Sequence, residues 1–216
     1  MVKKVTGIPG RGIMKPVKLN QAAIYPSKIV CIGRNYVDHI KELGNEMPAE
    51  PVIFLKPNSA ISDVIQSGLE SAIHYESEIT FMVKSCQLAA VGFGLDLTRR
   101  DLQSKLKSKG LPWERSKAFD GAAVFSEFVD CPANISQLRL ELFINGKLIQ
   151  AGGCELMINK PQDILEETRA FLTYEDGDLL MTGTPAGVGA LNKGDVFIGT
   201  IFDADKLLLK TEWTVQ

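Results

Sequence analysis

Hydrophobic residues in this chain come mostly in short runs or in alternation with polar residues, a pattern typical of β-strands. Helical spacing occurs in few places, and strands and helices do not alternate regularly along the chain. The pattern therefore predicts an α+β fold that is rich in strands, with a few helices, rather than a parallel α/β fold. The strands are expected at residues 28–32, 52–55, 74–81, 138–144, 147–150, 179–181, 195–202 and 206–215.

Three segments have the periodicity of an amphipathic helix: residues 37–43, 98–109 and 161–172. The first is followed by Gly44, a C-terminal stop, and the second opens on Thr98-Arg99-Arg100-Asp101, which resembles a capping box. The expected apolar stripes are Val37, Ile40 and Leu43 in the first helix, and Ile164, Leu165, Thr168, Phe171 and Leu172 in the third.

Glycine and proline mark the expected turns and loops. Asn145-Gly146 predicts a tight β-hairpin. Residues 44–51 form a loop that, with the helix before it, is a candidate mobile lid, and residues 60–72 form an irregular connection. Residues 1–27 predict a short lead-in of strands and turns, so residues 1–216 are expected to form one domain. The turn formers in this lead-in are Gly7, Pro9, Gly10, Gly12, Pro16 and Pro26.

Composition and charge exclude several classes of protein. The 216 residues can bury a full core, and a formal net charge of −2 gives no basic surface for nucleic acid or an anionic membrane. Neither a secretory segment nor a long apolar span is evident. The cysteines are far apart, which favours reduced, half-buried thiols and a cytoplasmic location. They are Cys31, Cys86, Cys131 and Cys154.

Three carboxylates are candidate metal ligands. Glu76 and Glu78 stand two apart in an expected strand, so their side chains face the same side, and Asp96 ends another apolar run. Oxygen ligands without a cluster of Cys or His suit a hard divalent ion such as Mg²⁺ or Mn²⁺. The alternative is that the two glutamates form the solvated face of a strand.

The chain has two histidines, and one of them is a candidate base. His39 lies three residues before Glu42 on an expected helix, off its apolar stripe. A carboxylate beside an imidazole fixes its tautomer and makes it more basic, as deprotonation of water requires. The alternative is an ordinary surface pair.

A glycine-rich segment and a lysine complete the candidate chemistry. Residues 183–189 lack the ending of a nucleotide P-loop, so they predict either a tight turn or backbone N–H groups that, with the Thr184 hydroxyl, hold an oxyanion. Lys117 is either a surface charge or, beside a metal, a group that stabilises an enolate. No Gly-x-Ser-x-Gly segment and no Gly-x-Gly-x-x-Gly segment that opens a helix after a strand occurs, so a serine nucleophile, ATP and NAD are not expected.

Taken together, these segments resemble the fumarylacetoacetate hydrolase family, in particular its short acylpyruvase-like members. Each segment is weakly specific alone, but the ordered set across residues 28–202 is highly specific. The matching segments are Cys31-Ile32-Gly33-Arg34-Asn35-Tyr36, Phe54-Leu55-Lys56-Pro57, His74-Tyr75-Glu76-Ser77-Glu78, Leu95-Asp96-Leu97-Thr98-Arg99-Arg100-Asp101-Leu102-Gln103, Lys117-Ala118-Phe119-Asp120 and Thr182-Gly183-Thr184-Pro185-Ala186-Gly187-Val188-Gly189.

The resemblance implies a mixed-sheet β-roll, usually a homodimer. It also implies a role for each candidate residue. The metal, Mg²⁺ or Mn²⁺ with Ca²⁺ as a possible substitute, would be held by Glu76, Glu78 and Asp96. His39 and Glu42, on the lid, would activate water, with Lys117 as a further catalytic group. The substrate would be bound by Arg34, Arg100, Gln103 and Thr184.

The implied activity is hydrolysis of the carbon–carbon bond of 2,4-diketo acids, such as acylpyruvates and fumarylpyruvate, to pyruvate and a carboxylic acid. The same site would also serve decarboxylation or keto–enol tautomerisation of oxaloacetate. A further alternative is a metal-binding scaffold without activity. The expected partner is therefore a small 2-keto or 2,4-diketo acid.

Overall fold

The computed structural model describes residues 14–44, 46–68 and 72–216. Three parts of the sequence-based predictions therefore lie outside the described residues. These are the lead-in up to residue 13, position 45 of the expected loop, and positions 69–71 of the expected connection.

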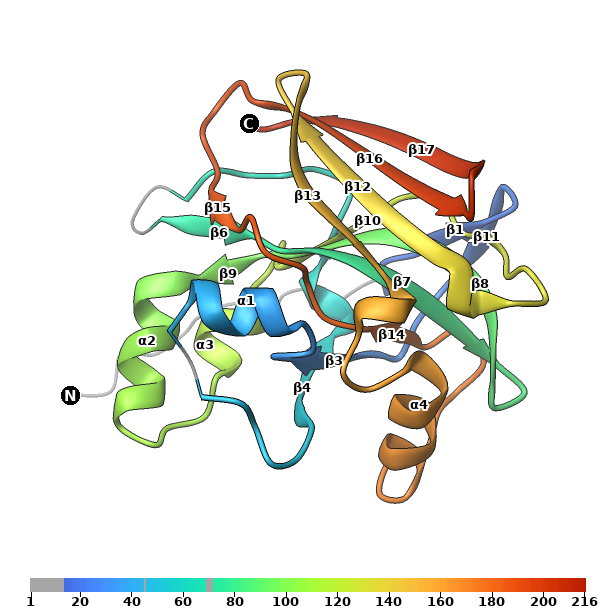
Figure 1. Ribbon diagram of the computed structural model, residues 1–216, viewed down its shortest axis with the longest axis horizontal. Coiled ribbons are helices and arrows are strands. Elements are labelled where there is room, and N and C mark those ends of the chain that lie inside the picture. Colours follow the sequence, from blue (N-terminus) through green and yellow to red (C-terminus); the bar gives the residue numbers. More distant parts are fainter. Residues whose placement is uncertain (1–13, 45, 69–71) are drawn as a thin grey trace, which may run out of the picture.

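A mixed eight-stranded sheet forms the body of the molecule (Figure 1). Most neighbouring strands are antiparallel, but β14 runs parallel to β3, and β10 runs parallel to β5. The order across the sheet is β4 (Val52–Pro57), β3 (Lys28–Gly33), β14 (Leu179–Met181), β7 (Ser77–Lys84), β8 (Gln87–Asp96), β10 (Ala123–Phe125) and β5 (Ile61–Ser62), and β11 (Val129–Asp130) also pairs with β8.

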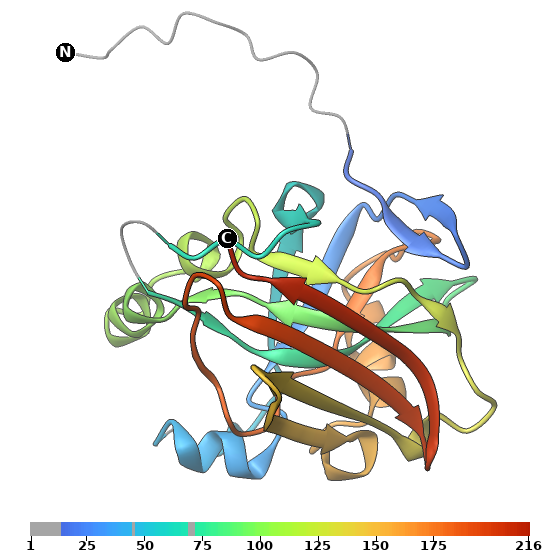
Figure 2. The same ribbon diagram turned by 90° about the horizontal axis from the view of Figure 1, so that it is seen from above.

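A four-stranded antiparallel sheet packs across the large one, as Figure 2 shows from above. Its order is β13 (Lys147–Gly153), β12 (Leu138–Ile144), β16 (Val196–Asp203) and β17 (Lys206–Thr214). The remaining strands of the described residues form two smaller sheets. They are β15 (Gly189–Ala190), β6 (Ile73–Tyr75) and β9 (Thr98–Arg99), and the hairpin of β1 (Val17–Leu19) and β2 (Ala22–Ile24).

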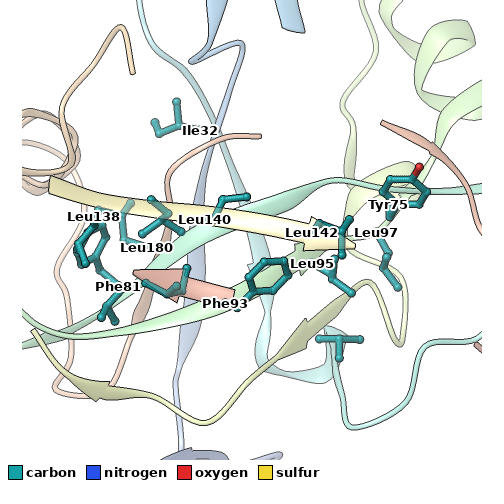
Figure 3. Close-up of a cluster of buried hydrophobic side chains, with 14 of the residues drawn as sticks. Ile32, Tyr75, Phe81, Phe93, Leu95, Leu97, Leu138, Leu140, Leu142 and Leu180 are labelled. Atoms are coloured by element: carbon teal, nitrogen blue, oxygen red, sulfur yellow. The ribbon is translucent and has the colours of Figure 1, made fainter. Parts of the chain in front are cut away.

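The core lies between the two main sheets (Figure 3). Alternate residues of β12, namely Leu138, Leu140 and Leu142, are fully buried, because successive side chains of a strand point to opposite faces. Phe93 of β8 packs directly against Gly199 of β16, where a Cβ atom would lie 2.8 Å from the ring. Glycine at this position therefore lets the sheets approach closely.

Among residues 14–44, 46–68 and 72–216, four short α-helices flank the sheets. In both ribbon views, α1 (Val37–Glu42), α2 (Arg100–Ser108) and α3 (Glu114–Lys117) lie at one end of the molecule, apart from α4 (Pro161–Arg169). Within the described ranges, none of the helices is long and apolar enough to cross a bilayer. Three 3₁₀ turns occur in the part of the chain that the structure describes. η1 (Asn58–Ala60) and η2 (Ile135–Gln137) connect strands, and η3 (Cys154–Leu156) lies between β13 and α4.

The observed architecture confirms the predicted strand-rich α+β fold with a mixed sheet and few helices. The Asn145-Gly146 hairpin forms, although β13 extends three residues beyond its predicted end. Predictions at element ends were less accurate. The predicted strand 74–81 is broken at Glu76, which separates β6 from β7.

The capping-box prediction was wrong. Helix α2 begins at Arg100, and its N-cap residue Arg99 makes no side-chain cap. Thr98 is a strand residue instead, because its hydroxyl donates to the Asp96 carbonyl oxygen and accepts a hydrogen bond from Lys117.

Two predicted helix faces were also partly wrong. In α1, Val37 and Leu43 are 37% and 36% exposed, whereas His39 is buried, because this short helix turns its histidine toward a cluster of buried acids. Helix α4 ends before Phe171, which is 60% exposed. The predicted half-buried thiols hold for Cys131, while Cys86 is exposed; all four cysteines are free.

Asp178 joins the starts of two neighbouring central strands. Its buried carboxylate accepts hydrogen bonds from the backbone N–H groups of Ser27, Lys28 and Glu175 and from the Ser27 hydroxyl, at 2.7–3.1 Å. It also forms an ion pair with Lys28. Burial alone would raise the pKa of Asp178, but these donors hold it below its ordinary value.

We expect Asp178→Asn to lower the free energy of unfolding at pH 7 by roughly 2–3 kcal/mol, because a buried, multiply bonded charge is lost. The depressed pKa stabilises the folded state above the unfolded-state pKa of about 4, and this contribution disappears as the pH falls through the folded-state value. Urea unfolding at pH 7 and below pH 4 measures the difference, which should shrink in acid. The exposed Asp205→Asn should change neither value.

Candidate active site

Three buried carboxylates meet near the end of the large sheet that carries α1, α2 and α3. Glu78 belongs to β7, Asp96 ends β8, and Glu76 occupies the break between β6 and β7. The Asp96 N–H donates to the Glu76 carbonyl oxygen at 2.9 Å, which sets the two residues side by side. One oxygen from each of the three carboxylates lies within 4.8 Å of the others, and none of these three residues is more than 5% exposed.

Lys117 lies among these acids. Its Nζ donates to Glu76 Oε2 at 2.8 Å, to Asp96 Oδ2 at 2.6 Å and to Thr98 Oγ1 at 2.7 Å. Burial would lower the pKa of Lys117, but the two carboxylates raise it overall. An ammonium has three N–H donors, so all of them are engaged within the protein. The predicted role of Lys117 toward an enolate stays a prediction.

Lys56 is a further cation beside the carboxylates, and no role was predicted for it from the sequence. It is fully buried, its Nζ lies 2.8 Å from Asp96 Oδ1, and it donates to the Lys117 carbonyl oxygen. The available signal was a lysine inside the apolar strand β4, on the same face as Phe54.

The three buried acids differ in how far nearby cations and hydrogen-bond donors balance their negative charge. Burial alone would raise the pKa of Glu76, but Lys117 and Arg100 hold it well below its usual range. Burial and the proximity of Asp96 and Glu76 raise the pKa of Glu78 well above its usual range. Glu78 Oε2 accepts a hydrogen bond from the Gly183 N–H at 2.7 Å. A further positive charge beside Glu78 would therefore stabilise its ionised form.

The donor set fits a hard divalent cation. Glu76, Glu78 and Asp96 offer three buried anionic oxygens that face one another, and these are the ligands that Mg²⁺ and Mn²⁺ prefer. Asp96 Oδ1 is buried and makes no hydrogen bond, although the Lys56 ammonium forms an ion pair with it at 2.8 Å. An anionic oxygen without a hydrogen bond can still donate a lone pair to a metal.

The predicted pairing of His39 with Glu42 is formed in α1. His39 Nδ1 lies 3.1 Å from Glu42 Oε2, and Glu42 Oε1 accepts a hydrogen bond from the Gly187 N–H at 2.9 Å. His39 is 5% exposed and borders the same cavity as the carboxylates. With Nδ1 engaged by Glu42, Nε2 is the ring nitrogen left to exchange a proton with a substrate.

Asn35 fixes the chain at the start of this helix. Its buried amide donates to the carbonyl oxygens of Thr182 at 2.8 Å and Asn159 at 2.9 Å, and its own Oδ1 accepts from the Asn159 N–H at 2.7 Å. The preceding Arg34 has a φ of 57°, in the left-handed region that side chains rarely adopt. The lid predicted from sequence thus has a firmly anchored first end.

A cavity of about 30 Å³ lies beside the carboxylates. Glu42 and Asp96 contact residues of its wall, and the other eight residues predicted for the site line it. These eight are Arg34, His39, Glu76, Glu78, Arg100, Gln103, Lys117 and Thr184. Arg100 donates to Gln103 Oε1 at 2.7 Å, and the Thr184 hydroxyl accepts from Gln150 at 2.9 Å. The roles assigned to these residues remain predictions.

The backbone N–H groups of the glycine-rich loop contact protein carboxylates, whereas one interpretation of the sequence was that they would hold an oxyanion. The N–H groups of Gly183 and Gly187 donate to the carboxylates of Glu78 and Glu42. The loop therefore positions a candidate metal ligand and the partner of the candidate base. Thr184 is the part of the loop that lines the cavity.

A larger, mostly apolar groove of about 640 Å³ lies next to the small cavity and shares Phe54, Trp113 and Lys117 with it. Its other walls include Leu55 of β4, Leu111 and the exposed Phe171. The greater volume is thus not where the carboxylates meet. The small cavity is therefore the candidate site of chemistry, because the candidate base and two of the three acids line it.

Residues 28–207 match the family described as "Fumarylacetoacetate (FAA) hydrolase C-terminal", and the chain belongs to this family. This confirms the resemblance found in the sequence. The crystal structure of fumarylpyruvate hydrolase from Pseudomonas aeruginosa in complex with Mn²⁺ and pyruvate superposes with a TM-score of 0.82. The two are 25% identical, and the match covers 97% of this chain and 98% of that one. The predicted roll of mixed sheets is also confirmed.

Curated relatives catalyse related reactions. The chain is 38% identical over 202 residues to oxaloacetate tautomerase YcgM of Escherichia coli (strain K12), which covers 85% of this chain and 92% of the relative. It is also 38% identical over 187 residues to the mitochondrial oxaloacetate decarboxylase of Dictyostelium discoideum, covering 78% and 86%. Because a relative is mitochondrial, the cytoplasmic location remains a prediction, as does the homodimer.

We expect the protein to bind one Mn²⁺ through the three acids, and Glu78→Gln to weaken this binding by roughly 100-fold or more, because one anionic ligand is lost. The amide oxygen can still accept the Gly183 N–H, so the fold should persist. Titration of Mn²⁺ by calorimetry measures the affinity. The exposed Glu166→Gln in α4 serves as the matched control, and equal affinities for the two variants would contradict the assignment.

Proposed function

We propose that this protein is a divalent-metal-dependent oxaloacetate keto–enol tautomerase. The observation that carries the proposal is one imidazole, paired with a carboxylate, in a cavity of about 30 Å³ beside three convergent acids. Moving a proton between carbon and oxygen requires a base and an electron sink, but no attacking water. The similarity to an oxaloacetate tautomerase over 85% of the chain supports the same reaction.

Glu76, Glu78 and Asp96 would hold the Mg²⁺ or Mn²⁺ ion, which would act as a Lewis acid toward the keto-acid oxygens. Arg100 and Gln103, hydrogen-bonded to each other, would orient the neighbouring carboxylate of the substrate. Positioning of this kind reduces the entropy lost on the way to the transition state.

His39 Nε2 would then take a proton from C3 of the keto form, while Glu42 stabilises the resulting imidazolium. The same nitrogen would return the proton to the 2-oxygen, which gives the enol. In the opposite direction the enol loses its hydroxyl proton and C3 is protonated. No bond between carbon atoms is broken, and the ring ends in its starting state.

A second candidate is the hydrolysis of acylpyruvates, which was our first expectation from the sequence. The apolar groove of about 640 Å³ that adjoins the cavity favours it, since it offers room for an acyl group. A solved structure with a similar fold is that of a fumarylpyruvate hydrolase. Decarboxylation of oxaloacetate, named in another relative, needs the electron sink without the base.

The test offers the Mg²⁺- or Mn²⁺-loaded protein enol-oxaloacetate, acetylpyruvate and fumarylpyruvate and analyses the products. We expect faster loss of enol absorbance with no carbon dioxide and no cleavage. Carbon dioxide with pyruvate would assign decarboxylation, and a carboxylic acid with pyruvate would assign hydrolysis. Failure to change any of the three compounds would leave a metal-binding scaffold and overturn the proposal.

We expect His39→Gln to lower kcat for tautomerisation by roughly 10²- to 10⁴-fold, the usual contribution of a positioned base. Mn²⁺ affinity should change little, because His39 is not one of the predicted ligands. Initial rates at saturating oxaloacetate measure the effect. Asp38→Asn, an exposed change on the same helix, is the control and should keep the wild-type rate.

Glu42→Gln tests the pairing separately. The amide oxygen can accept the Gly187 N–H, so the amide NH₂ would face His39 Nδ1 and force the ring proton onto Nε2. That tautomer cannot accept a substrate proton at Nε2, and we expect a loss of kcat of at least about tenfold. KM should be nearly unchanged. A wild-type kcat would argue against Glu42 as the orienting group.

A further inference from the structure

Two cations outside the carboxylate cluster also line the small cavity: Arg34, before α1, and Lys107, in α2. Nε of Arg34 is buried and has no hydrogen-bond acceptor. Lys107 Nζ lies 5.9 Å from the centroid of the Trp113 ring, at the wall that the cavity shares with the apolar groove. Arg34 and Lys107 are close enough to interact electrostatically, so together they bring positive charge to one part of the cavity wall.

The charges within the carboxylate cluster already balance. When all three are ionised, as a bound cation would favour, Glu76, Glu78 and Asp96 carry three negative charges. Three cations form ion pairs with members of this set: Lys56, Lys117 and Arg100. A divalent ion would therefore bring an excess of two positive charges, and the Arg34 guanidinium borders the same cavity. Such a cavity favours a ligand with two negative charges over a ligand with one.

The cations at this wall also act on one another. Burial lowers the pKa of Lys107, and the nearby Arg34 and Arg100 guanidinium groups lower it further. Mutual repulsion of this kind is relieved when an anion binds among the cations. An anionic group of the ligand placed beside Lys107 would thus be stabilised.

We propose that Arg34 and Lys107 form a subsite for the second carboxylate of a 2-keto dicarboxylate, with Lys107 as the residue that determines this specificity. The inference rests on the proposed function, because the first carboxylate and the keto oxygen are taken to lie at the metal and at Arg100. Lys107 lies beside Trp113, which lines both the cavity and the apolar groove. A charge there favours a short dicarboxylic acid over an acylpyruvate.

The experiment compares two unreactive ligands that differ in the second carboxylate: malate and lactate, both 2-hydroxy acids. Their affinities for the Mn²⁺-loaded protein are measured by calorimetry. We expect the wild type to bind malate roughly 10- to 100-fold more tightly than lactate, as a charged hydrogen bond implies. Lys107→Met should reduce this ratio about tenfold through malate alone, and Lys107→Arg should largely restore it.

Lys105→Met, an exposed change in the same helix, is the matched control and should keep the wild-type ratio. Equal affinities for malate and lactate in the wild type, or an unchanged ratio in Lys107→Met, would overturn the inference. Tautomerisation is assayed separately, so the two proposals can fail independently. A Lys107-dependent preference in a protein without tautomerase activity keeps the subsite, and active protein with no preference removes it.

Discussion

The burial of three carboxylates at one point is the constraint on which the rest of this structure depends. Removing such charges from water is costly, so they must be met by cations or donors at short range. Lys117 does this for Glu76 and Asp96, and it also ties α3 to β9 through Thr98. Lys56 adds a second buried ammonium beside Asp96. The active-site end of the fold is thus held by the same contacts that neutralise its acids.

The two main sheets give this cluster of carboxylates a rigid support. The acids come from β7, β8 and the break before β7, and these strands pair with each other and pack under the four-stranded sheet through residues such as Phe93. The base, in contrast, lies on a six-residue helix, α1, whose first end is anchored by Asn35. Candidate ligands on rigid strands and a candidate base on a short separate helix suit a site that must admit a substrate before proton transfer begins.

Much of this arrangement was predictable from the sequence. Strand periodicity and the Asn145-Gly146 turn gave the fold class, and the spacing of Glu76, Glu78 and His39 pointed to acids and a base that do come together. Predictions failed where a tertiary contact overrides a local signal. Thr98 has the sequence of a helix cap but is bound by Lys117, and His39 is buried because of acids distant in sequence. Lys107 looks like an ordinary lysine until the fold shows its neighbours, and the one signal for Lys56 was its position inside an apolar strand.

The loop that carries Gly183 and Gly187 has a consequence of its own. Within five residues, two of its amides bind carboxylates from different elements, Glu78 of β7 and Glu42 of α1. A shift of this backbone that lengthens one contact is transmitted to the other. Because both carboxylates depend on the same short loop, the effects of substitutions at Glu78 and Glu42 are not expected to be additive.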